Sequence, residues 1–107
     1  MNFKDFQADS MRTMPKINDE LAMANYCMGL AGESGEVVDQ LKKVIFHGHN
    51  FDREAIEKEL GDVLHYLSGI ATLLDISMEE IAYKNLEKLK KRYPEGFSKE
   101  ASRNRVE

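Results

Sequence analysis

The stretch GLAGESGEVVDQL, residues 29–41, combines apolar residues at helical spacing with three glycines, one at every third position from its start. Glycine in a helix interior costs about 1 kcal/mol per site relative to alanine. Two acids, Glu33 and Glu36, stand among these glycines. Because glycine carries no side chain, we expect a partner helix, a metal ion or a phosphate group to approach the backbone closely beside both acids.

The rest of the chain predicts an all-α fold, because no segment alternates convincingly between polar and apolar residues as a half-buried strand does. N-capping residues, prolines and glycines place the expected helices at about residues 2–13, 19–46, 52–74 and 77–93. We therefore predict an antiparallel helical bundle of four to five helices, two of them long and central. Residues 1–97 would form a single domain, and residues 98–107 a polar tail that frays.

Composition narrows the class of protein. The chain has 107 residues and a formal net charge of −4, which disfavours non-specific binding to nucleic acid. A single cysteine, Cys27, excludes an intrachain disulfide and reads as a core side chain, so we expect a cytoplasmic protein. The most apolar stretch, VLHYLSGIATLL, falls short of the roughly 20 residues that span a bilayer, and membrane insertion is not expected.

A second acid pair, Glu59 and Asp62, follows in EKELGDVLHYL, residues 57–67. With residues spaced about 100° apart around a helix, Glu59 falls inside the apolar arc and Asp62 on its edge. On the preceding helix, Glu33 borders the apolar stripe and Glu36 lies one step beyond. Two consecutive helices thus carry acids three residues apart, with one member of each pair at the core-facing side.

Facing carboxylates repel one another, and burying them uncompensated costs several kcal/mol or more. A cation removes this cost, and carboxylate oxygens suit Mg²⁺ or Mn²⁺. Protein-bound Mg²⁺ is commonly shared with substrate phosphates, which explains how an acidic protein could hold an acidic substrate.

The last predicted helix adds Asn85, which points inward from an apolar stripe and would either be satisfied in the core or donate to a substrate. Lys88 and Arg92 flank it, and Lys43 lies on nearly the same helical line as Glu36. All three cations could reach phosphate, although near helix C-termini they also favour the helix dipole and solvate the surface.

The segments GLAGESGEV, ELGDVLHYL and NLEKLKKRYPEGF together resemble the MazG-like all-α nucleoside triphosphate pyrophosphohydrolases, in particular short bacterial and phage members. This superfamily also includes dimeric dUTPases and phosphoribosyl-ATP pyrophosphohydrolases. The resemblance implies Mg²⁺-dependent cleavage between the α and β phosphates of a nucleotide, with release of a monophosphate and pyrophosphate. Matched position by position, the resemblance implies four metal ligands, Glu33, Glu36, Glu59 and Asp62. It also implies three substrate contacts, Asn85, Lys88 and Tyr66.

For the reaction we expect Glu33 or Glu36 to orient or deprotonate the attacking water, with Lys88, Lys43 or Arg92 adding positive charge at the phosphates. The chain has no tryptophan. A base would therefore stack on another aromatic side chain or bond to a loop histidine, the candidates being Tyr26, Phe46, Phe51, His47 and His49.

Three alternatives stay open. The same fold could act on another nucleotide phosphate, such as phosphoribosyl-ATP, or specifically on dUTP or dCTP. The protein could be a non-catalytic helical binding module, or a di-iron carboxylate bundle, for which Asp62 and His65 supply the only near match to Glu-x-x-His. We expect a homodimer or a tetramer, because two short helices hardly cover the apolar arcs of two long ones.

Overall fold

The structure, a computed structural model, describes residues 1–106, and among these it contains α-helices and one short 3-10 helix but no strand. The elements are α1 Phe3–Ser10, η1 Met11–Thr13, α2 Asp19–Phe46, α3 Arg53–Leu73, α4 Met78–Arg92 and α5 Lys99–Arg103. The all-α prediction is confirmed, as are the two long helices, which have 28 and 21 residues.

The helix ends follow the local signals of the sequence. The side chains of Asn18, Asp52 and Ser77 each accept a hydrogen bond from the backbone N–H three residues on, at 2.9, 3.1 and 3.0 Å. These bonds satisfy N–H groups that have no partner within the helix. Gly48 and Gly96 adopt φ values of +70° and +86° after α2 and α4, a conformation that favours glycine at helix ends.

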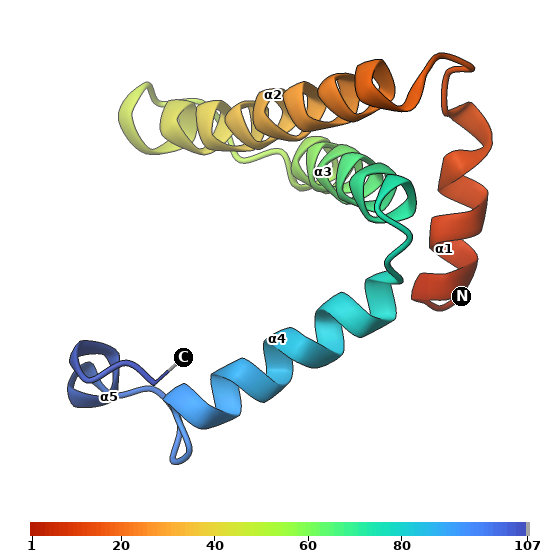
Figure 1. Ribbon diagram of the computed structural model, residues 1–107. Coiled ribbons are helices and arrows are strands. Elements are labelled where there is room, and N and C mark those ends of the chain that lie inside the picture. The colour runs from red at the N-terminus through yellow and green to blue at the C-terminus, as the bar shows by residue number, and fades with distance from the viewer. Residues whose placement is uncertain (107) are drawn as a thin grey trace.

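Helices α2 and α3 fold back on one another as a hairpin (Figure 1). Their contact is reciprocal, because each helix carries a tyrosine followed by a glycine three residues later. The ring of Tyr66 lies where a side chain at Gly29 would stand, and the ring of Tyr26 lies where one at Gly69 would stand. The two rings meet edge-on at a centroid distance of 5.5 Å. Bare backbone on each helix thus receives an aromatic ring from the other.

The close approach expected at the glycines of residues 29–41 is therefore confirmed at Gly29, where the neighbour is a partner helix. A methyl group added at Gly32 or Gly35 would meet no atom of the described chain within 4 Å. Within one chain, the three glycines do not share one packing role.

Helix α1 joins the hairpin to α4 through the side chain of Gln7. Its Nε2 donates to Thr72 Oγ1 and to the carbonyl of Ile76, both at 3.0 Å. Its Oε1 accepts from the backbone N–H of Met78 at 3.0 Å. One amide thereby ties α1 to the end of α3, to the linker and to the start of α4. The linker also holds Asp75 in the left-handed region, with φ of 58°.

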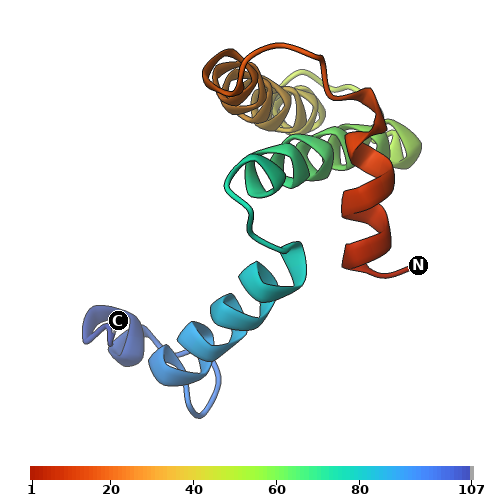
Figure 2. The same cartoon turned by 45° about the vertical axis from the view of Figure 1, so that its right-hand side comes forward.

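Beyond this junction, α4 runs away from the α2–α3 pair, and the described chain does not close a bundle (Figures 1 and 2). The radius of gyration is 16.9 Å, against about 13 Å for a compact chain of this length. The accessible surface is 8261 Å², against about 6,100 Å² for a compact monomer of 12.3 kDa. The antiparallel bundle predicted from the sequence is thus not completed by one copy of the chain.

One smaller expectation was wrong. Cys27 is exposed rather than part of the core, because the hairpin contact turns α2 so that Tyr26 is the buried side chain, at 1% exposure. The predicted tail contains the short helix α5, with Ser98 accepting a hydrogen bond from Ala101 N–H at 3.0 Å. The last tail position, 107, lies outside the described residues. None of the helices in residues 1–106 combines the length and hydropathy that a bilayer-spanning segment requires.

Gly29→Ala should destabilise the fold by about 1–3 kcal/mol, because the new methyl group collides with the Tyr66 ring and overpacks the hairpin. Gly32→Ala is the matched control, since it meets open space and should stabilise the helix by up to about 1 kcal/mol. Urea denaturation followed by circular dichroism measures both. Equal stability of the two variants would contradict the reciprocal contact.

Candidate functional site

The hairpin brings together three of the four acids that the sequence singled out. Glu33 comes from α2, and Glu59 and Asp62 come from consecutive turns of α3. Each offers one carboxylate oxygen, and these oxygens lie within 4.8 Å of one another. Glu33 and Glu59 are partly buried while Asp62 is exposed, so the cluster has one side open to solvent.

The electrostatics of this acid cluster call for a proton or a cation. A hydrogen bond between the carboxyl groups of Glu33 and Glu59 raises the pKa of Glu33, and desolvation raises it further. The charges of Asp62, Glu59 and Glu36 act in the same direction. Three hard oxygen ligands from rigid helices, open on one side, fit Mg²⁺ or Mn²⁺ that keeps waters and reaches a phosphate.

Glu36 stands beside the acid cluster rather than within it. It is exposed, and it lies outside the group whose oxygens converge. Its charge nevertheless contributes to the raised pKa of Glu33, one helical turn earlier. Of the four predicted acids, three therefore converge, and the fourth, Glu36, lies at the edge of the cluster.

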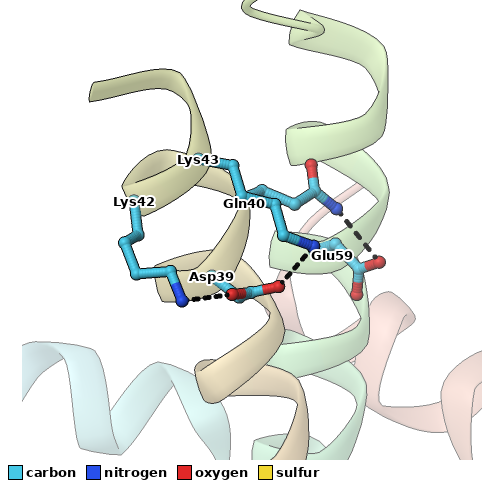
Figure 3. A network of polar contacts seen from close by, with 5 residues as sticks. All are labelled: Asp39, Gln40, Lys42, Lys43 and Glu59. Carbon is cyan, nitrogen blue, oxygen red and sulfur yellow. Dashed lines mark hydrogen bonds and ion pairs between the residues drawn. The ribbon is translucent and has the colours of Figure 1, made fainter. Parts of the chain in front are cut away.

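Two polar side chains that the sequence analysis missed extend this site along α2 (Figure 3). Gln40 Nε2 donates to Glu59 Oε1 at 3.4 Å and links the two helices next to the acids. Asp39 pairs with Lys43 at 2.9 Å and with Lys42 at 3.1 Å. The sequence could have identified Gln40 by its spacing. It lies four residues after Glu36 and seven after Glu33, and therefore on the same helix face.

The bond to Asp39 fixes Lys43, which the sequence made a candidate phosphate contact. This bond raises the pKa of Lys43, and the charge of Glu36 adds to the effect. The ammonium group thus lies beside Asp39, on the same stretch of α2 as Gln40 (Figure 3).

The predicted substrate contacts on α4 are not brought to the acids within one chain. Asn85 and Lys88 are exposed and Arg92 is partly buried, and all three lie on the helix that runs away from the hairpin. Asn85 is exposed in the single chain, together with the apolar stripe from which it was predicted to point inward, because α4 packs mainly against α1.

Tyr66 lies in the hairpin contact, with its ring beside Gly29, Tyr26 and His65. Tyr26 is buried, which removes it from the candidates for stacking on a base. The other candidates, Phe46, Phe51, His47 and His49, are all exposed at the closed end of the hairpin.

His65 lies apart from the converging acids. Its Nδ1 is 2.6 Å from Ser10 Oγ of α1, and its ring contacts those of Tyr26 and Tyr66. In residues 1–106 the group of acids that could hold a metal includes no histidine. This arrangement gives no support to the di-iron alternative.

Comparisons with known proteins identify the family of the chain. A family model described as the MazG nucleotide pyrophosphohydrolase domain matches residues 17–97, which include α2, α3 and α4. The chain is similar to the Gene 37 protein of Mycobacterium phage L5, with 33% identity over 82 residues, or 73% of this chain and 72% of that protein. No solved structure gives a significant match to the chain.

Mn²⁺ or Mg²⁺ should stabilise the protein through the acid cluster, by about 2.7 kcal/mol at a free concentration of 100 times the dissociation constant. Glu59→Gln should weaken this effect and also raise the melting temperature without metal, because it relieves repulsion among the carboxylates. Thermal unfolding with and without the ion measures both changes.

Glu57→Gln is the control, because Glu57 lies on the same helix but pairs with Arg53 at 3.0 Å on an exposed face. It should keep the metal response of the wild type. A metal response that survives Glu59→Gln undiminished would remove the acid cluster from metal binding.

Proposed function

Because the chain belongs to the family of MazG nucleotide pyrophosphohydrolase domains, we propose that it hydrolyses nucleoside triphosphates between the α and β phosphates. The products are a nucleoside monophosphate and pyrophosphate, and the role is nucleotide-pool control or housecleaning. The observation that carries the proposal is the convergence of Glu33, Glu59 and Asp62 from two helices, with their oxygens within 4.8 Å. Carboxylates this close repel one another unless a proton or a cation lies between them, and the proposed metal ion removes that repulsion.

In this proposal Glu33, Glu59 and Asp62 hold Mg²⁺. When bound, the ion lowers the pKa of a water and neutralises charge that develops on the phosphate oxygens. Glu36, at the edge of the cluster, is the carboxylate that orients and deprotonates the attacking water, although it could also contribute to the metal site. Lys43 adds positive charge on the same side of α2, where Asp39 positions it.

The rest of the site comes from a second copy of the chain. Apolar side chains stay exposed along α2 and α4, for example Met28 at 74%, Phe46 at 76% and Leu86 at 57%. The surface of one copy exceeds that of a compact monomer by more than the roughly 800 Å² that each partner buries in a standard interface. A homodimer, or a tetramer built from it, would cover these side chains.

Pairing of copies also gives α4 a function. Its apolar stripe, which includes Ile81, Leu86 and Leu89, is exposed and has Asn85 at its centre. If this stripe packs on the hairpin of a partner, Asn85 and Lys88 approach the partner's acid cluster, with Arg92 on the same face. The substrate contacts that one chain leaves remote from the acids would thus be supplied in trans.

A panel of canonical and modified nucleoside triphosphates with Mg²⁺ should give pyrophosphate and a monophosphate. Separate assays for pyrophosphate and orthophosphate measure the cleavage position, and orthophosphate as the first product would rule out cleavage between the α and β phosphates. Phosphoribosyl-ATP, dUTP and dCTP belong in the panel because they separate the alternatives. If the protein hydrolysed none of these nucleotides and bound no metal, the result would favour the alternative of a non-catalytic binding module.

Glu36→Gln should lower kcat by at least about 100-fold, the scale of a lost general base, while the helical circular dichroism signal survives. Glu57→Gln should keep wild-type kcat. Wild-type turnover by Glu36→Gln would show that another group deprotonates the attacking water.

Size-exclusion chromatography with light scattering should give a mass of at least twice 12.3 kDa. Leu86→Glu should reduce this mass and activity together, since it places a charge in the apolar stripe. The control Lys84→Ala changes a side chain about 160° from Leu86 around the helix, where Lys84 pairs with Glu80 at 3.2 Å, and should keep the wild-type mass.

Sharing of sites between copies has its own test. A 1:1 mixture of inactive Glu59→Gln and Lys88→Ala proteins, exchanged to equilibrium, should regain about a quarter of wild-type activity, because half the dimers are hybrids with one intact site each. No recovery in a mixture that forms hybrid dimers would place Lys88 and the acids in one chain.

A further inference from the structure

A cavity of about 260 Å³ lies at the closed end of the α2–α3 hairpin. Its walls are the last turns of α2, the loop of residues 49–52 and the first turn of α3. Its lining includes Gln40, Val44, Asn50, Phe51, Ala55 and Ile56, and the charged side chains of Lys43 and Asp52 also line it. Pockets that hold drug-sized ligands measure about 300–1,000 Å³, so this cavity fits one ring system rather than a whole nucleotide.

The lining combines the groups that recognise a planar polar ring. Val44, Ala55 and Ile56 supply apolar surface, and Phe51 supplies an aromatic face that is 58% exposed. Gln40 and Asn50 supply side-chain amides, which carry hydrogen-bond donors and acceptors together. Proteins read unpaired bases in this way, by stacking on an aromatic side chain and by hydrogen bonds to the base edges.

The cavity adjoins the acid cluster through Gln40. Gln40 lines the cavity and at the same time donates to Glu59 Oε1 (Figure 3). Ile56, on the cavity wall, lies one turn before Glu59, which is about 4.5 Å along the helix axis. A pentose can bridge such a step, with its phosphates toward the acids and its base in the cavity.

The loop that closes the cavity is held in place before any ligand arrives. The N–H of His49 donates to the carbonyl of Lys43 at 3.1 Å, after the turn that Gly48 makes with positive φ. Asp52 caps α3 through Ala55 N–H at 3.1 Å. A loop that is fixed at both ends loses little conformational freedom on binding.

We infer that this cavity is the base-binding subsite, in which Phe51 stacks on the nucleobase and the amides of Asn50 and Gln40 read its edge. The inference rests on the proposed function for the direction of the phosphates. It makes the loop of residues 49–52 the part of the chain that sets base preference.

The first test compares KM for nucleoside triphosphates with KM for a pentose 5-triphosphate that lacks a base. Phe51→Ala and Asn50→Ala should each raise KM for the nucleotide about tenfold, the scale of one lost base contact, and leave KM for the base-free compound unchanged. Arg53→Ala is the control, since Arg53 adjoins the loop but does not line the cavity. It should change neither value.

The second test needs no turnover. Nucleosides without phosphate, at millimolar concentration and without metal, should shift the backbone amide NMR signals of residues 49–52 in the wild type. The same titration of Phe51→Ala should give no shifts.

These readings separate the two proposals. Turnover of nucleotides with unchanged KM in Phe51→Ala and no loop shifts would overturn the base subsite and leave the proposed function intact. Loop shifts in a protein that hydrolyses no nucleotide would overturn the proposed function and support a base-binding cavity. A Phe51→Ala protein that loses its oligomeric state but binds nucleosides normally would assign the loop to the contact between copies and overturn the subsite.

Discussion

The reciprocal insertion of Tyr66 over Gly29 and of Tyr26 over Gly69 is the contact on which the rest of the structure depends. Each ring occupies space that any other residue type would fill at the glycine, so the two helices approach closely at this level. Gly29 lies one turn before Glu33, and Tyr66 lies one turn after Asp62. The contact therefore sets the separation of α2 and α3 next to the acids, whose oxygens consequently converge within 4.8 Å.

Helices α2 and α3 alone form only a hairpin, so other helices must pack on both of its faces to bury their apolar side chains. α1 lies against α3 and, through the amide of Gln7, fixes where α4 begins. α4 then leads away from the hairpin, which leaves its own apolar stripe and much of α2 exposed. In the proposed dimer, the apolar stripe of α4 and the substrate contacts that one chain keeps away from the acids would both be placed by the second copy.

Much of this could be predicted from single residues and their spacing. Asn18, Asp52 and Ser77 cap helices where predicted, because an N-cap is a local hydrogen bond within three residues. The two acid pairs were recognisable from helix geometry alone, as was the partial burial of Glu59. The roles of Cys27, Tyr26 and Gly32 were not, because small changes in helix rotation exchange neighbouring residues between core and surface. The direction of α4 depends on Gln7, 71 residues before Met78, and no local pattern reports such a bond.

By itself the sequence determined the helices, their ends and the acids that face the hairpin interior, because propensity, capping and the helical period act over a few residues. Tertiary structure alone decided which acids converge, with Glu33, Glu59 and Asp62 inside the cluster and Glu36 at its edge. It also decided that Tyr66 packs on Gly29, and that Gln40 connects Glu59 to a cavity under the loop. These outcomes depend on the distance and rotation between two helices, which are set by side chains that meet only after the chain has folded back.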